Sequence, residues 1–177
     1  MKIQQNADSA QQIALAEDSF RAAVEKTVQL LRDKKLTVGF AESCTGGLLS
    51  SGFTERAGVS DVFLGAVISY ANKVKQKFLK VSGESLKTDG AVSEVVARQM
   101  AEAARQELEV SVAIAITGVA GPSGGTALKP VGTVFIGVAG LESETKVFEH
   151  HFDGNRKLVQ LQSCIEAIQH LNEFINK

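Results

Sequence analysis

The chain has 177 residues, of which 44% are hydrophobic and 22% are charged, with 19 basic against 20 acidic side chains. This length and composition predict one globular domain with its own core, and a net charge of −1 argues against a nucleic acid or a membrane as its main partner. Two cysteines are too few for a disulfide scaffold. The first 20 residues lack the apolar segment of a signal peptide, and no run approaches the ~18 apolar residues of a membrane span, so we expect a cytoplasmic protein.

The N-terminal part of the chain begins polar and continues as an amphipathic helix. Residues 1–12 are mostly polar, and we expect them to be flexible. From Phe20 to Leu31 apolar residues recur at helical spacing, and a basic cluster suited to a helix C-terminus follows. The β-prone run 36–41 then predicts a buried strand, which leads through the polar turn 42–47 into another helix.

The rest of the chain alternates between strands and helices. We expect a strand at 63–70, a lysine-rich helix, a helix capped by Ser93, an apolar strand at 110–117, a hairpin of strands at 131–139 and 145–152 joined by 140–144, and a last helix with apolar residues from 158 to 171. This alternation with one late hairpin predicts an α/β fold, a three-layer α/β/α sandwich with a mixed, mostly parallel sheet.

Polar segments follow three of the predicted strands, at 42–47, 70–75 and 117–130. In α/β sheets, ligands bind beyond the carboxyl ends of the strands. Because the three segments fall at such ends, they predict a single site.

Ser43 is the candidate nucleophile, because it lies in a strand-to-helix turn. The free backbone amides of Thr45, Gly46 and Gly47 can hold an oxyanion or a phosphate there. The alternative is that Ser43 or Thr45 only caps the helix. Cys44 is a rival nucleophile, but no histidine lies near it in sequence, so we expect a small buried cysteine.

A serine nucleophile needs a base. The three histidines, His150, His151 and His170, lie outside the strand-end loops and lack zinc-ligand spacing with either cysteine, so we expect surface or packing roles and no metal site. A lysine remains as the base, provided that burial or a neighbouring positive charge keeps it neutral. Lysines follow Tyr70 at helical spacing, and the alternative is a solvated helix face.

The glycine-rich loop after the apolar strand is a candidate phosphate site. Its backbone amides from Thr117 through Gly118 and Gly121 can form an anion-binding nest, although a plain long turn is equally compatible with this composition. Arg156 can bind a phosphate through two hydrogen bonds or lie exposed. No P-loop or dinucleotide-binding motif occurs, which argues against an NTPase or a dehydrogenase.

Taken together, these segments resemble the CinA C-terminal-domain family, whose characterised activity is nicotinamide-nucleotide amidase. The similarity covers roughly residues 20 to 175 and is carried by six motifs in order: Ala41–Gly47, Ser69–Asn72 with Lys75, Gly90–Ser93, Thr117–Pro122, Lys129–Thr133 and Gly154–Arg156.

The resemblance implies an α/β/α amidohydrolase that converts nicotinamide mononucleotide to nicotinate mononucleotide and ammonia, without a cofactor, and that assembles as a homo-oligomer. It maps a Ser-Lys dyad onto Ser43 and Lys75, with orienting, oxyanion-supporting and phosphate-binding roles for Tyr70, Thr117 and Arg156. The family usually has an acidic residue where Asn155 stands, so the salt bridge that would orient Arg156 is not expected. Larger relatives carry an additional N-terminal domain, and we expect its pyrophosphatase activity to be absent.

Two other functions remain open on sequence grounds. One is a nucleotide-binding module of the same fold without turnover, which would bind nucleotides and release no ammonia. The other is an amidase for a different carboxamide, which a substrate panel would identify.

Overall fold

The computed structural model describes residues 2–141 and 143–177, and side chains from residue 9 onwards. Glu142, in the predicted hairpin turn, and Met1, in the predicted flexible segment, lie outside the described residues. The chain forms, in order, α1 (Lys2–Lys34), β1 (Val38–Glu42), α2 (Leu48–Thr54), a 3-10 helix (Val59–Asp61), β2 (Phe63–Ile68), α3 (Asn72–Leu79), α4 (Gly83–Thr88), α5 (Glu94–Glu107), β3 (Val112–Gly118), β4 (Thr133–Gly140), β5 (Lys146–His151) and α6 (Arg156–Ile175).

The strands form one mixed sheet in the order β2-β1-β3-β4-β5. β1 is parallel to both β2 and β3, whereas β4 is antiparallel to β3 and β5. Only β4 therefore runs against the other strands, which confirms the predicted mixed, mostly parallel sheet. The late hairpin is confirmed as β4 and β5.

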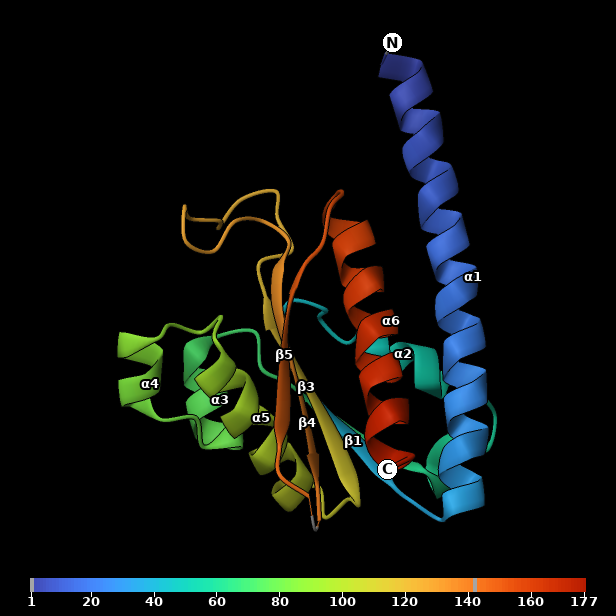
Figure 1. Cartoon of the computed structure of the whole chain (residues 1–177), viewed down its shortest axis with the longest axis vertical. Helices are drawn as coiled ribbons and strands as arrows, with labels where there is room; N and C mark the ends of the chain where they lie inside the picture. Colours follow the sequence, from blue (N-terminus) through green and yellow to red (C-terminus); the bar gives the residue numbers. More distant parts are fainter. Residues whose placement is uncertain (1, 142) are drawn as a thin grey trace.

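Helices cover both faces of the sheet, with α1, α2 and α6 on one side and α3, α4 and α5 on the other (Figure 1). β3 shows how the sequence builds both layers. Val112, Ile114 and Ile116 join the core under α1 and α6, whereas Ala113 and Ala115 face the core under α5. Alternate residues of a strand point to opposite faces, so bulky and small side chains are segregated between the two layers. The three-layer sandwich is confirmed.

Three local features differ from the expectations or add to them. Residues 2–12, expected to be flexible, continue α1 as a helix that extends past the sheet (Figure 1). The short helix α4 was not predicted, because it buries no side chain and therefore shows no apolar periodicity; Ser82 caps it. β2 ends at Ile68, so Tyr70 lies in the loop before α3. None of the helices in the described part of the chain is both long and apolar enough to span a membrane.

Candidate active site

The polar segments after β1, β2 and β3 meet at one edge of the sheet, because β1 lies between β2 and β3. They enclose a pocket of about 270 Å³. The pocket walls contain seven of the predicted site residues: Ser43, Tyr70, Lys75, Thr117, Gly118, Gly121 and Arg156. A larger hollow of about 740 Å³ lies along α1 and Arg56, but no serine, threonine, cysteine or histidine lines it.

Ser43 and Lys75 are hydrogen-bonded to each other at the bottom of this pocket. Lys75 lies on the first turns of α3 and is only 1% exposed. Its Nζ lies 2.7 Å from Ser43 Oγ and 2.5 Å from the backbone carbonyl of Ser69. When the amine is neutral, it can donate to the carbonyl and keep its lone pair for the serine proton. This is the arrangement that a serine nucleophile and its base require.

The protein environment favours the neutral form of this lysine. Burial lowers the pKa of Lys75 from 10.5 to about 8, and the nearby Cys44 thiol opposes this shift only in part. A lysine at pKa 8 is a usable base near neutral pH, whereas a solvated lysine is almost entirely protonated. By contrast, burial raises the pKa of the Cys44 thiol to about 12, so the thiol stays protonated. The two shifts favour Ser43 over Cys44 as the nucleophile.

The turn that presents Ser43 is held by a buried carboxylate. Glu42, the last residue of β1, is fully buried, and its carboxylate accepts hydrogen bonds from the amides of Gly47, Leu49 and Ser50 and from the Ser50 hydroxyl. An anion at this place matches the partial positive charge of a helix N-terminus. Gly47 has a φ of 102°, which a residue with a side chain rarely adopts.

Arg156 closes the pocket from the side of α6. Its guanidinium donates to the carbonyl of Gly121 at 2.9 Å and to the hydroxyl of Tyr70 at 3.1 Å. Asn155, which stands where an acidic residue was expected, caps α6 by accepting from the amide of Leu158. The orientation of Arg156 therefore comes from a carbonyl and a phenol instead of a salt bridge.

Comparison with known proteins identifies the family. The family model described as CinA C-terminal domain matches residues 21–175. The chain belongs to the CinA C-terminal-domain family. A CinA-like protein of Crocosphaera subtropica is 48% identical over 144 residues, 81% of this chain and 35% of that protein. A CinA-like protein of Thermotoga maritima is 41% identical over 151 residues, 85% of this chain and 36% of that protein.

Solved structures show the same fold. The crystal structure of a competence/damage inducible protein from Agrobacterium tumefaciens superposes with a TM-score of 0.86 at 34% identity, covering 90% of this chain and 96% of that one. A CinA superfamily protein from Escherichia coli gives a TM-score of 0.83 at 31% identity, covering 88% of this chain and 90% of that one. The chain spans about a third of the length of the curated relatives that it matches.

The CinA domain places three predicted ligand-binding residues outside the pocket. Thr45, Gly46 and Gly47 do not line it. The amide of Gly46 donates to the carbonyl of Ser43, and that of Gly47 donates to the Glu42 carboxylate. Sequence reasoning reserved these amides for a ligand anion, but the Ser43 carbonyl and the Glu42 carboxylate already accept their hydrogen bonds. The remaining predicted residue of the turn, Thr45, is buried, and no described group bonds its hydroxyl.

Three hydrogen bonds to backbone carbonyls position the site of the CinA domain, and none of these contacts was predicted. The hydroxyl of Thr117 donates to the carbonyl of Ala91 at 2.7 Å and so fixes a segment of the pocket wall. The side chain of Gln160 on α6 donates to the carbonyl of Cys44 at 2.7 Å. The carbonyl of Ser69 holds Lys75. Backbone acceptors have no signature in a sequence, which is why these three contacts could not be predicted.

The histidines lie away from the pocket, as expected, but two of them form a cluster that was not predicted. His150 on β5 and His170 on α6 approach each other through their Nε2 atoms at 2.8 Å, and Glu166 lies beside them. His151 points elsewhere, to Thr133 and Glu149. No sequence pattern indicates the cluster, because the two histidines are 20 residues apart on different elements.

Proposed function

We propose that this CinA domain is an amidohydrolase that converts nicotinamide mononucleotide to nicotinate mononucleotide and ammonia through a dyad of Ser43 and Lys75. The observation that carries the proposal is the 2.7 Å contact between Lys75 Nζ and Ser43 Oγ, made by a buried lysine whose pKa is lowered to about 8. Membership of the CinA C-terminal-domain family supports it.

The reaction proceeds as two acyl transfers. Neutral Lys75 removes the proton of Ser43 as Oγ attacks the carboxamide carbon, and the lysine then gives this proton to the departing ammonia. A water molecule next loses a proton to Lys75 and attacks the acyl-enzyme. The C–O bond to Ser43 breaks, the proton returns to Oγ, and the pyridine carboxylate leaves.

The oxyanion of each tetrahedral intermediate needs hydrogen-bond donors. The hydroxyl of Thr117 already donates to Ala91, and the amides of Gly46 and Gly47 are occupied. Within the described part of the chain, the amides of Cys44 and Thr45 have no bonded acceptor, and of these two residues only Cys44 lines the pocket. We assign the oxyanion contact to this amide, which directly follows the nucleophile.

The pocket suits a compact anionic ligand. Its described walls carry the basic side chains of Lys75 and Arg156 and no carboxylate. Lys75 faces the nucleophile, so Arg156, with the amides of the loop at 118–124, is the partner for a phosphate. A volume of about 270 Å³ lies just below the ~300–1,000 Å³ typical of drug-sized ligands, which favours a mononucleotide over a dinucleotide.

Ammonia release measures this function directly. The chain should release ammonia from nicotinamide mononucleotide much faster than from free nicotinamide, and Ser43→Ala should lower kcat by at least about 10³-fold while nucleotide binding persists. Nucleotide binding without any ammonia release would show a silent binding module instead. Release from another carboxamide, with none from the mononucleotide, would leave an amidase with a different substrate.

A further inference from the structure

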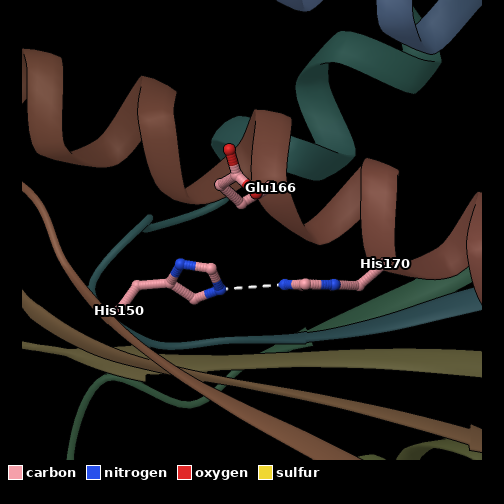
Figure 2. Close-up of side chains that lie close together, drawn as sticks. All are labelled: His150, Glu166 and His170. Carbon is pink, nitrogen blue, oxygen red and sulfur yellow. Dashed lines mark hydrogen bonds between the residues drawn. The ribbon is translucent and has the colours of Figure 1, made fainter.

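A cluster of two imidazoles and one carboxylate lies between β5 and α6, apart from the pocket. It consists of His150, Glu166 and His170, whose nearest ligand atoms all lie within 4.8 Å of one another (Figure 2). None of the three lines the catalytic pocket. β5 is the edge strand of the sheet, and β3 and β4 separate it from β1, which carries the nucleophile turn.

The fold brings the three side chains together from two elements. Glu166 and His170 are four residues apart on α6, so they lie on the same face of the helix, one turn apart. His150 projects from β5 toward this face, and its Nε2 lies 2.8 Å from Nε2 of His170 (Figure 2). Two imidazole nitrogens at this distance are hydrogen-bonded when one carries a proton and the other a lone pair, and with both lone pairs free they can instead bind one metal ion.

We propose that His150, Glu166 and His170 bind a divalent late transition-metal ion, which fastens β5 to α6. Imidazole nitrogens with a carboxylate oxygen are a ligand set for nickel, copper or zinc, and not for magnesium or calcium. Ligands in cis positions at ~2.0 Å from a metal lie ~2.8 Å apart, whereas tetrahedral ligands lie ~3.3 Å apart. The two nitrogens, which are hydrogen-bonded to each other here, are 2.8 Å apart, close to the cis separation.

The surroundings of the cluster fit such a site. The ring of His170 stacks on Phe148 with a centroid separation of 3.7 Å and an angle of 3°, which fixes its orientation. Its other nitrogen, Nδ1, is buried, and its nearest carboxylate is that of Glu173 at 3.9 Å. With Nδ1 protonated toward this carboxylate, Nε2 keeps a lone pair for the metal. The Gln169 amide, oriented with its nitrogen toward Glu166, donates to that carboxylate at 3.0 Å.

Isothermal titration of the untagged, EDTA-treated chain with NiCl₂ tests the proposal, with ZnCl₂ and MgCl₂ as comparison ions. We expect one Ni²⁺ per chain, weaker Zn²⁺ binding and no Mg²⁺ binding. At 100-fold excess over Kd, Ni²⁺ should raise the Tm by roughly 5–10 °C. His150→Gln and Glu166→Gln should each weaken the Kd at least about tenfold, whereas the control His151→Gln should change it by less than about twofold.

Three results would overturn the site. The first is the absence of any heat of binding up to about 1 mM Ni²⁺. The second is unchanged Ni²⁺ binding in both the His150→Gln and the Glu166→Gln variants. The third is a loss of Ni²⁺ affinity in His151→Gln as large as the loss in His150→Gln. The test uses no variant of His170, because its ring stacks on Phe148 and replacing it could disturb folding. Far-UV circular dichroism without metal establishes that each variant is folded.

Discussion

The lowered pKa of Lys75 predicts the pH dependence of the reaction. At pH 7, a lysine with a pKa of about 8 is about 9% neutral, whereas one at 10.5 is about 0.03% neutral, a difference of about 300-fold in available base. The value of kcat/KM for nicotinamide mononucleotide should therefore rise about tenfold per pH unit below 8 and level off above it. Initial rates of ammonia release between pH 5.5 and 10 measure this profile.

Replacing Lys75 can distinguish the effect of its positive charge from the effect of its proton transfer. Lys75→Arg keeps a positive charge but cannot release a proton, so kcat should fall by at least about 10³-fold. Lys73→Arg is the matched control, because Lys73 is exposed on the same helix and should remain active. If Lys75→Arg stayed active, or if the wild-type profile rose only through pH 10, the dyad would be refuted.

The same shift should appear in the stability of the fold. The folded-state pKa of Lys75 lies below the unfolded value, so the unfolded chain binds more protons between about pH 8 and 10.5, and stability rises with pH through this window. Below pH 8 the charged lysine costs about 3 kcal/mol, which Lys75→Met removes. The advantage of Lys75→Met over the wild type in free energy of unfolding should thus become smaller by about 3 kcal/mol between pH 7 and pH 11, because only the wild type gains stability over this range. A difference independent of pH would contradict the lowered pKa.

Other contacts of the site give further predictions. Glu42→Gln should reduce the free energy of unfolding in urea by about 1–3 kcal/mol and lower kcat more than it raises KM, because the carboxylate holds the nucleophile turn; an unchanged kcat would exclude this positioning role. Arg156→Ala should raise KM for the mononucleotide more than for the unphosphorylated riboside, and Tyr70→Phe should do so more weakly; equal effects on both substrates would rule out phosphate binding. Cys44→Ala should keep most of the activity in the ammonia assay, and its loss would reopen the choice of nucleophile.

The position of the site could be predicted from the sequence because it depends on chain order and strand ends. Apolar runs fixed where β1, β2 and β3 lie, and each is followed by a polar segment. Once these strands are neighbours, Ser43 and Lys75 must come to the same edge of the sheet. The resemblance to the CinA family supplied the choice of Lys75 among the lysines, and the structure adds that its side chain is buried.

What could not be predicted depends on which partner each polar group finds. The sequence shows that the turn at 42–47 has free amides, but not that the carboxylate of Glu42 folds back to accept from Gly47 and from the following Leu49 and Ser50. It shows isolated histidines, but not that β5 and α6 pack with His150 against His170. Both outcomes depend on contacts between different parts of the folded chain, about which the local periodicity of the sequence carries no information.

One helix holds both ends of the proposed substrate site. Gln160 on α6 fixes the carbonyl of Cys44, next to the nucleophile, and Arg156, one turn earlier on the same helix, lies where we place the phosphate. Four residues of an α-helix rise ~6 Å, and this distance does not adjust from one ligand to the next. If the proposed function holds, the protein should therefore select substrates by the length between carboxamide and phosphate, so that a compound with one added methylene in that span binds but is not aligned with Ser43.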